Sequence, residues 1–345
     1  MSAAPLLAVR DLRVGFATEG GFLQAVDGVG FDLAPGEVLA IVGESGAGKS
    51  VAAQTIVGLT RSPNARIEGS VKLRGDELID ADEAALRKVR GDRVAMVFQD
   101  PMTSFNPVYR VGAQIAEAIH AHRDVSKPAA RARAVELLDS VGIPDAGRRV
   151  DDYPHEFSGG MRQRAMIAMA LALDPEVLIA DEPTTALDVT IQAQILRLLQ
   201  DLNRERGLAT ILITHDLGVV AEVADRVLVM YAGRVVEEGT LDEIFYDPQH
   251  PYTWGLLGSL TRLDRPRPPR LPQIGGAPPS LLELPQGCAF RPRCPHEFGK
   301  CPQVPGLEAR LADAPAHRDR CWLTPEEKRA KRVVEGRIGL EAPAP

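Results

Sequence analysis

The sequence predicts an α/β fold built around a largely parallel β-sheet. Short apolar runs rich in β-branched residues alternate with longer helix-like segments through the first 240 residues, and this alternation is typical of a parallel sheet with crossover helices. The runs that we interpret as buried strands are Val38–Val42, Val94–Gln99, Val177–Asp181 and Thr210–Thr214. The helical patterns between them include Lys49–Leu59, Ser158–Leu173 and Thr190–Arg206.

The composition is that of an ordinary globular protein. The 345 residues exceed one average domain, and hydrophobic residues at 45% with charged residues at 25% allow a sizeable core. The formal net charge of −7 argues against broad nucleic-acid binding, which requires a basic face. No apolar run approaches the roughly 18–20 residues that span a bilayer, and Met1–Leu12 lacks the pattern of a secretory signal. We therefore expect a cytosolic chain that reaches a membrane only through a partner.

Changes in residue composition and periodicity along the chain predict a main domain, a linker and a C-terminal segment. Residues 1–260 form a main domain, in which residues 101–173 are almost all helix-like and interrupt the alternation as a helical insert. Prolines crowd residues 261–286, which we interpret as an extended linker. Residues 287–345 carry all four cysteines. Within them, Thr324–Glu327 has the pattern of a capping box with proline at the first helical position, which predicts a short charged helix.

A glycine-rich loop predicts a phosphate site. Gly43–Ser50 (GESGAGKS) fits G-x-x-x-x-G-K-S, directly after a predicted strand and at the start of a predicted helix. Glycines let backbone N–H groups turn inward around phosphate oxygens, and the helix N-terminus adds a favourable dipole. Lys49 would reach the β- and γ-phosphates, and the Ser50 hydroxyl would ligate Mg²⁺. The alternative is a glycine-rich turn that matches by chance. The binding residues predicted in this loop are Gly43, Ser45, Gly46, Gly48, Lys49 and Ser50.

Two acidic residues mark the end of a predicted strand. Asp181 closes the apolar run and Glu182 follows it directly. Beside a phosphate loop, the first acid would hold Mg²⁺ and the second would accept a proton from the attacking water. The alternative is a solvated strand edge. The phosphate loop upstream favours the functional interpretation.

A segment before the acidic strand resembles the signature sequence of ATP-binding-cassette (ABC) ATPases. It is Ser158–Arg164 (SGGMRQR), with Met161 where the wider family often has glutamine, a variant common among peptide importers. Thr185–Asp188 resembles the D-loop of that family, and Gln99 stands at the Q-loop position. The resemblance covers residues 7–260. It implies a P-loop NTPase of ABC type, with a RecA-like core, a β subdomain and a helical subdomain, followed here by a small cysteine-rich segment.

Two further residues match single positions of the same family. His215 follows a predicted strand, where the switch histidine belongs, and Phe16 lies 33 residues before Lys49, where an aromatic ring stacks on adenine. Taken alone, His215 reads as a helix-terminal or core histidine and Gln99 as a polar strand end. Phe16 could equally be a core residue, with Phe22 close by in the sequence.

The resemblance implies that two such domains pair head to tail. Each ATP then lies between the phosphate loop of one subunit and the signature of the other, so Ser158 and Gly160 would act on the partner's nucleotide. A helix N-terminus with flexible glycines is a second anion site, which suits this division. The resemblance assigns catalysis to Glu182, His215 and Gln99, Mg²⁺ to Ser50, Gln99 and Asp181, and further nucleotide contacts to Phe16, Gln99, Asp181, Ser158, Gly159, Gly160 and Asp188.

The four cysteines predict a metal or cluster site. Their spacing is Cys288-x5-Cys294-x6-Cys301-x19-Cys321, without the C-x2-C arms of ordinary zinc ribbons. Four thiolates suit either a [4Fe–4S] cluster or zinc, and interleaved histidines make a mixed zinc site conceivable. Spacing alone leaves cluster, zinc and free thiols open.

The end of the chain narrows the resemblance. His250–Thr253, the proline-rich linker and the cysteine pattern, which ends in Cys321-Trp322, resemble the tail of dipeptide/oligopeptide (and nickel) importer ATPases. The resemblance implies a [4Fe–4S] cluster at Cys288, Cys294, Cys301 and Cys321. Such a cluster would be either a structural staple for a tail too small to build its own core, or a redox regulator.

We therefore expect an ATP-hydrolysing subunit of an ABC importer, at the cytoplasmic face of the inner membrane. By resemblance its partners are a second ATPase subunit, more often a paralogue than an identical copy, two transmembrane permease subunits and an extracytoplasmic solute-binding protein. Short peptides are the implied cargo, and nickel, glutathione or another solute is the alternative. A soluble ABC ATPase acting on DNA or ribosomes is the remote alternative, since such proteins carry tandem cassettes or long heptad runs that this sequence lacks.

Overall fold

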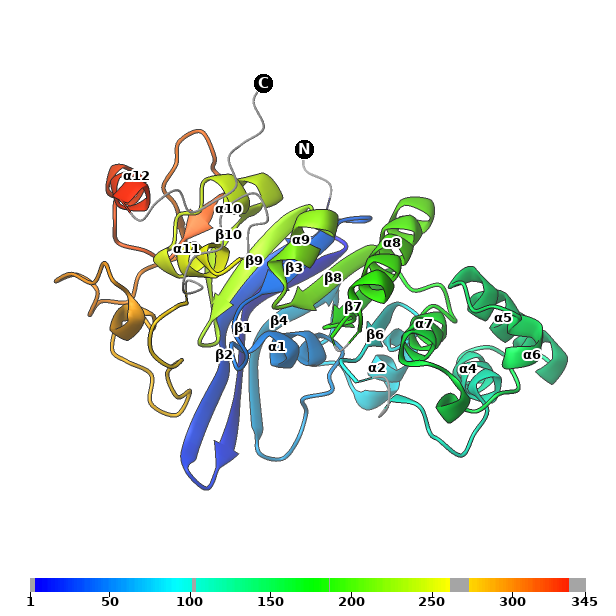
Figure 1. Ribbon diagram of the computed structural model, residues 1–345. Coiled ribbons are helices and arrows are strands. Elements are labelled where there is room, and N and C mark those ends of the chain that lie inside the picture. The colour runs from blue at the N-terminus through cyan, green and yellow to red at the C-terminus, as the bar shows by residue number, and fades with distance from the viewer. Residues whose placement is uncertain (1–3, 101–103, 186, 261–272, 335–345) are drawn as a thin grey trace. The chain divides into compact units, whose positions relative to one another are not determined.

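The computed structural model describes residues 4–100, 104–185, 187–260 and 273–334 (Figure 1). The chain divides into two compact units. The first contains Met1–Leu7, Leu33–Val38 and Leu73–Ile213, and the second contains Ala8–Asp32, Leu39–Lys72 and Thr214–Pro345. The start of the predicted helical insert, Ala186 of the D-loop motif and much of the predicted linker lie outside the described residues.

Three parallel strands form the centre of the first unit. They are β6 (Val94–Val97), β7 (Val177–Asp181) and β8 (Ala209–Thr214). Val177 of β7 lies opposite Val94 of β6 and Ala209 of β8. Every residue of β7 and β8 is buried, as the unbroken apolar runs predict for strands covered on both faces. A short strand, β5 (Asp76–Glu77), also belongs to this unit.

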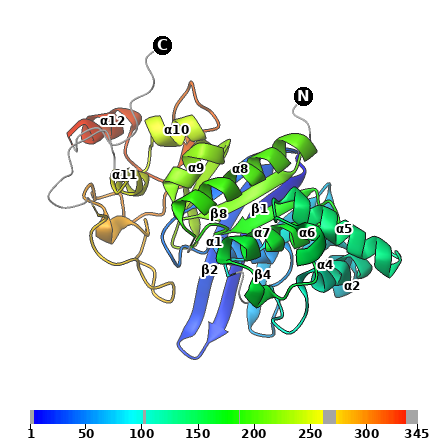
Figure 2. The same ribbon diagram turned by 45° about the vertical axis from the view of Figure 1, so that its right-hand side comes forward.

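The remaining elements of the first unit are helices. They are α2 (Glu83–Val89), α4 (Val111–His120), α5 (Lys127–Ser140), α6 (Ala146–Arg149), a 3-10 turn (Pro154–Glu156), α7 (Gly159–Ala170) and α8 (Val189–Arg206). Helices α4 to α7 lie side by side (Figure 2) and share one apolar core, to which Ile115, Leu137 and Ile167 contribute. The described part of the predicted helix-like segment therefore contains helices α4 to α7, joined by turns and loops.

The second unit contains strands from both ends of the chain. β1 (Leu7–Thr18) lies between β2 (Gly21–Leu33) and β4 (Ala65–Leu73). A second group runs in the order β11 (Glu308–Ala309), β12 (Arg318–Asp319), β10 (Arg234–Thr240), β9 (Arg226–Tyr231) and β3 (Val38–Val42). β3 and β9 are parallel, whereas β9, β10, β12 and β11 pair antiparallel.

Short helices complete the second unit. They are α1 (Lys49–Ile56), α9 (Leu217–Val223), α10 (Leu241–Tyr246), α11 (Pro251–Gly258), a 3-10 turn (Arg291–Arg293) and α12 (Pro325–Val334). The predicted capping box before α12 is present, because Thr324 Oγ1 accepts from the Glu327 N–H at 3.3 Å and Glu327 Oε2 accepts from the Thr324 N–H at 2.8 Å. Over the described ranges, none of the helices combines the length and the apolar character needed to cross a bilayer.

Candidate nucleotide site and cysteine pocket

The phosphate loop predicted at Gly43–Ser50 joins β3 to α1 in the second unit. Glycine is required at two of its positions. A Cβ on Gly43 would lie 2.2 Å from the Met230 carbonyl oxygen, and one on Gly48 would lie 2.3 Å from that of Ala25, with Gly48 also at φ +93°. Only glycine tolerates this conformation without strain. The loop is thus pressed against backbone on two sides.

Lys49 lies inside this loop. Its side chain is 5% exposed, and Nζ donates to the carbonyl oxygens of Gly43 at 2.7 Å and Glu44 at 3.1 Å. The N-terminus of α1 opens at Gly48, with no acidic residue in the first turn. A buried ammonium beside a helix N-terminus is a site for an anion. The geometry therefore suits a phosphate, with the Ser50 hydroxyl one residue further along the helix.

The acid predicted to hold Mg²⁺, Asp181, and the predicted general base, Glu182, lie at the end of β7 in the first unit. Asp181 is 3% exposed and Glu182 adopts φ +48°, a conformation uncommon outside glycine. Glu182 Oε2 accepts two hydrogen bonds, from Gln99 Nε2 and from Thr185 Oγ1, each at 2.9 Å. The Glu182 N–H donates to the Ile213 carbonyl oxygen at 2.8 Å. The structure thus brings Gln99 and Glu182 together and fixes the direction of the carboxylate.

The signature segment begins α7 in the same unit. The Ser158 hydroxyl caps the helix by accepting from the Met161 N–H at 3.3 Å. A Cβ on Gly160 would lie 2.7 Å from the Ile191 side chain, so α7 starts in close contact with α8. Asp188 in turn caps α8, with Oδ1 accepting from the Ile191 N–H at 3.0 Å. Ser158 and Asp188 therefore each cap a helix, in addition to the nucleotide contacts predicted for them.

The last two predicted nucleotide residues belong to the second unit. Phe16 is half-buried in β1, and His215 is exposed directly after β8. Phe22 is 47% exposed and covers Gly15, where an added Cβ would lie 2.3 Å from the ring. Both phenylalanines lie on the β1–β2 hairpin, so the structure leaves each of them as a candidate for adenine stacking.

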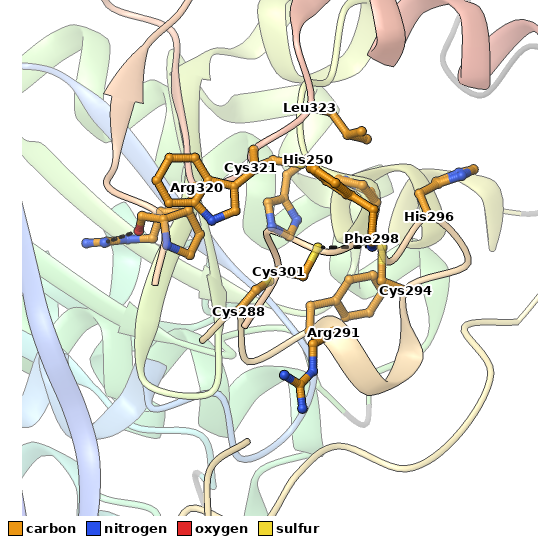
Figure 3. Close-up of a pocket in the computed structure, with 14 residues that line it drawn as sticks. His250, Cys288, Arg291, Cys294, His296, Phe298, Cys301, Arg320, Cys321 and Leu323 are labelled. Atoms are coloured by element: carbon orange, nitrogen blue, oxygen red, sulfur yellow. Dashed lines mark hydrogen bonds between the residues drawn. The ribbon is translucent and has the colours of Figure 1, made fainter. Parts of the chain in front are cut away.

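The four cysteines line one pocket of the second unit (Figure 3). Cys288 donates its N–H to the Cys301 carbonyl oxygen at 2.9 Å, and the Phe298 N–H reaches Cys301 Sγ at 3.4 Å. Burial raises the pKa of the Cys288 thiol, and it raises those of Cys294 and Cys321 to about 12. These three thiols are therefore protonated unless a cation compensates their charge. Histidines and aromatic rings complete the lining, among them His250, His296, Phe290 and Trp322.

Comparison with known proteins identifies the family. Residues 26–185 match the family model described as ABC transporter, and residues 236–301 match that of the oligopeptide/dipeptide transporter C-terminal region. The dipeptide transport ATP-binding protein DppD of Bacillus subtilis is 52% identical over 331 residues, which are 95% of this chain and 97% of that protein. The oligopeptide transport ATP-binding protein OppD of Salmonella typhimurium is 54% identical over 304 residues, 88% of this chain and 90% of that one.

This chain is a member of the ABC transporter ATP-binding protein family. A solved structure agrees: the dimeric bacterial ABC transporter cassette MJ0796 superposes with a TM-score of 0.61 at 30% identity, over 68% of this chain and 98% of the cassette. The ABC cassette fold predicted from the sequence is confirmed, and ATP with Mg²⁺ is the expected ligand set of this ATPase.

The predicted metal at the cysteines is not supported by the side-chain arrangement of this ABC ATPase. The donor set is suitable, because four thiols and two histidines face one pocket. Across the described ranges, however, no three His, Cys, Asp or Glu side chains converge closely enough to hold a metal ion. The four thiols therefore line one pocket, but no three of them lie close enough together to bind a single metal ion such as zinc.

Three site residues escaped the sequence reasoning. Thr185 belongs to the D-loop motif, yet its hydroxyl bond to Glu182 could not be foreseen. Tyr252 Oη accepts from the N–H of Glu44 in the phosphate loop at 2.8 Å, and Arg293 forms an ion pair with the Glu44 carboxylate. These last two residues lie more than 200 positions from Glu44, with separations of 208 and 249. Only the tertiary fold brings them there.

Proposed function

We propose that this ABC ATPase is the ATP-hydrolysing subunit of an importer for short peptides. The proposal depends on one observation: the Glu182 carboxylate at the end of β7 is oriented by hydrogen bonds from the Gln99 amide and the Thr185 hydroxyl. A carboxylate held by two donors, next to the buried Asp181, is suited to act as a general base beside a metal-binding acid. The names of DppD and OppD support peptides as the cargo.

The phosphate loop supplies the binding half of this chemistry. Lys49 would leave the carbonyl oxygens of Gly43 and Glu44 and turn to the β- and γ-phosphates of ATP. The Ser50 hydroxyl, Gln99 and Asp181 would hold Mg²⁺, which neutralises charge on the phosphates. Phe16 would stack on adenine. Each of these roles follows from the resemblance.

The Glu182 carboxylate would act in the hydrolytic step. Glu182 would take a proton from a water molecule whose oxygen forms the new bond to the γ-phosphorus, while the bond to the β–γ bridging oxygen breaks and ADP leaves. His215 would contact the γ-phosphate. Ser158, Gly159 and Gly160 at the start of α7, with Asp188 at the start of α8, would complete the site of a partner ATPase. Two cassettes are therefore needed for two complete sites.

The assembly follows from the same reasoning. We infer a second ATPase subunit, with a paralogue favoured over an identical copy, two membrane-spanning permease subunits and a solute-binding protein outside the membrane. The chain would lie peripherally on the cytoplasmic face of the inner membrane. Nickel, glutathione or another solute is the alternative cargo, which the residues of an ATPase subunit do not contact. The cassette relatives give no support to the alternative of action on DNA or ribosomes.

The test is ATP turnover of Glu182→Gln in the complex reconstituted with its permease subunits and solute-binding protein. Loss of a general base lowers turnover by about 100-fold or more, and binding of ATP should persist. Unchanged turnover would contradict the assignment and place hydrolysis in the other ATPase subunit. Uptake of a labelled dipeptide, measured in parallel with uptake of Ni²⁺, decides the cargo.

Glu176→Gln is the matched control. Glu176 directly precedes β7, at the opposite end from Glu182, and pairs with Arg74 and Arg93. Its loss removes one carboxylate from the same strand region without touching the proposed base. Turnover close to wild type in this variant, combined with collapse in Glu182→Gln, would support the proposed catalytic role.

We further propose that Cys288, Cys294, Cys301 and Cys321 hold a [4Fe–4S] cluster. All four side chains line one pocket, which supports the idea, because cluster iron is bound by four cysteine thiolates. The buried thiols would lose their protons only on binding a cation. Iron and acid-labile sulfide analysis of anaerobically purified protein tests this, with Cys294→Ala as the comparison. Protein that contains neither iron nor sulfide would refute it.

A further inference from the structure

The phosphate loop carries a negative charge of its own. Glu44 is the second residue of the loop, and its side chain is 27% exposed. The same loop is proposed to bind a triphosphate, which carries several negative charges. A carboxylate in this position repels the ligand, since like charges near a partly buried site interact strongly. Something must therefore offset the charge of Glu44.

Arg293 meets this carboxylate from the cysteine-rich segment. Its Nη1 lies 2.6 Å from Glu44 Oε2 and its Nη2 lies 3.0 Å from Oε1, a bidentate pair. The Arg293 side chain is only 4% exposed. Its Nε donates to the Gly275 carbonyl oxygen at 2.9 Å, and its guanidinium lies over the Tyr231 ring. An arginine guanidinium stays protonated throughout the accessible pH range, so the cation beside Glu44 persists.

The backbone of the phosphate loop is also held by a hydrogen bond to a residue outside the loop. Tyr252, in α11, accepts the Glu44 N–H at 2.8 Å through its phenolic oxygen. Tyr231, Tyr252 and Phe290 pack against one another, with ring centroids 4.6–5.4 Å apart. Phe290 and Cys294 flank Arg293 in the sequence and line the cysteine pocket. The pocket, the aromatic cluster and the loop contact therefore form one continuous packed region of the second unit.

We propose that Arg293 is a positioning residue of the nucleotide site, which cancels the charge of Glu44 and so permits the loop to bind phosphate. The cysteine-rich segment thereby contributes an arginine to the ATP site of its own chain. This inference rests on the proposed function of the loop. It differs from a purely mechanical link, because a mechanical link is broken equally by removing either partner, whereas an uncompensated negative charge in the phosphate loop arises only when the arginine is removed.

The experiment compares the affinity of four purified variants for a fluorescent ATP analogue with that of the wild type. Arg293→Met leaves Glu44 uncompensated and should bind about tenfold more weakly, equivalent to about 1.4 kcal/mol. Glu44→Gln should bind as well as the wild type or better. The double variant Glu44→Gln/Arg293→Met should return to within about threefold of the wild type. Arg318→Met is the control, since it breaks the ion pair of another tail arginine with Glu238 and should leave affinity unchanged.

The outcomes separate the possibilities. If Glu44→Gln weakens binding as much as Arg293→Met, and the double variant is no better, the link is mechanical and the inference is wrong. Unchanged affinity in folded Arg293→Met also overturns it. If Arg293→Met does not fold, the inference still requires that Glu44→Gln lose no affinity and that Arg293→Lys, which keeps the charge, bind within about threefold of the wild type. Lys49→Ala tests the site itself, because undiminished binding there would refute the proposed function and not the role of Arg293 alone.

Discussion

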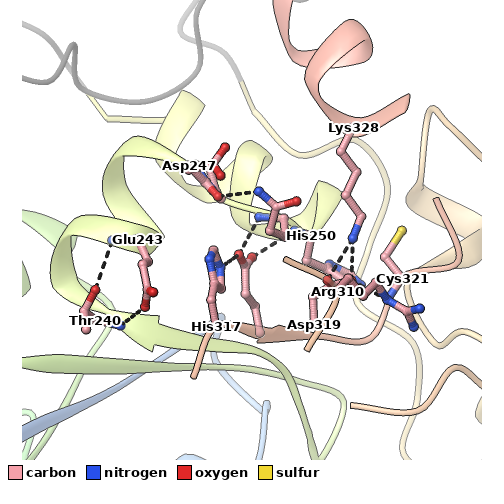
Figure 4. Close-up of polar contacts among 12 residues, drawn as sticks. Thr240, Glu243, Asp247, His250, Arg310, His317, Asp319, Cys321 and Lys328 are labelled. Atoms are coloured by element: carbon pink, nitrogen blue, oxygen red, sulfur yellow. Dashed lines mark hydrogen bonds and ion pairs between the residues drawn. The ribbon is translucent and has the colours of Figure 1, made fainter. Parts of the chain in front are cut away.

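Removing Lys328 should release the end of the chain from the second unit. Lys328 lies in α12 with a side chain that is 0% exposed, and Nζ contacts both oxygens of Asp319 at 2.8 Å (Figure 4). Asp319 is 1% exposed and also accepts from the Cys321 N–H at 2.9 Å. Lys328→Met preserves much of the volume and removes the charge. It leaves a buried carboxylate whose remaining cation, Arg310, lies 3.6 Å away.

The expected cost follows from the burial of the pair. Removing one partner of a buried ion pair costs about 3–5 kcal/mol. Burial already raises the pKa of Asp319 to about 6 despite Lys328. The lone carboxyl would therefore take up a proton at neutral pH, which limits the loss. We expect about 3 kcal/mol, a roughly 100-fold increase in local opening of β12 and α12.

Hydrogen exchange is the assay, because opening of this segment need not unfold the whole chain. Amides of residues 318–334 should exchange faster in Lys328→Met, whereas those of β9 should change little. Arg329→Met, at an exposed position on the same helix, is the control. Asp319→Asn/Lys328→Met should recover much of the protection, since no charge is then stranded. Protection within about 0.5 kcal/mol of wild type in Lys328→Met would refute the reasoning.

Three further predictions concern the loop, the proposed base and a buried histidine. Gly48→Ala should abolish ATP binding with a near-native circular dichroism spectrum, since the new Cβ would lie 2.3 Å from the Ala25 carbonyl oxygen; wild-type affinity would contradict the loop geometry. Thr185→Val removes a side-chain donor to Glu182, so turnover should fall about tenfold while ATP affinity holds, as single-turnover and binding assays would show. Burial opposes the charge on His317, but the hydrogen bond to Glu237 raises the pKa of His317 above its ordinary value. The stabilisation that protonated His317 contributes to the fold is therefore complete below the ordinary histidine pKa, and it is lost as the pH rises through the pKa of His317 in the folded protein. In urea unfolding, His317→Gln should therefore be more destabilising at about pH 6 than at about pH 9, and an equal penalty at both would argue against a charged His317.

The elements nearest the motifs could be predicted because their signals are local. The strand Val177–Asp181 has the predicted bounds, and the helix predicted from Lys49 begins there but ends at Ile56. The capping box at Thr324 depends on residues three positions apart. Hydrophobic runs, glycines and caps act within a few residues, which is the range that sequence patterns report.

Strand β10 shows why other elements were missed. Its sequence RVVEEGT contains two adjacent glutamates, which differ from the apolar run expected of a buried strand, yet Glu237 is 0% exposed and Glu238 is 6% exposed. Glu237 pairs with His317 at 2.8 Å, and Glu238 pairs with Arg318, each 80 residues away. Buried carboxylates are tolerated when such partners exist, and a sequence pattern does not contain the partners. The pairing of Arg293 with Glu44 was hidden for the same reason.

These buried pairs bear on how the cysteine-rich segment relates to the cassette. Without residues 308–334, β10 would lose His317 and Arg318, the side-chain partners of Glu237 and Glu238. Glu237 would then keep only uncharged donors such as the Gln249 and His250 N–H groups, which makes its buried charge more costly. The dependence runs in the other direction as well, since β12 pairs with β10 and the buried His317 forms its hydrogen bond with Glu237. Each part therefore loses a partner of a buried polar side chain when the other is removed. The segment that carries the cysteines is therefore stabilised together with the sheet that contains β3, from which the phosphate loop begins. A change in the cysteine pocket can reach Glu44 through contacts of Phe290 and Arg293.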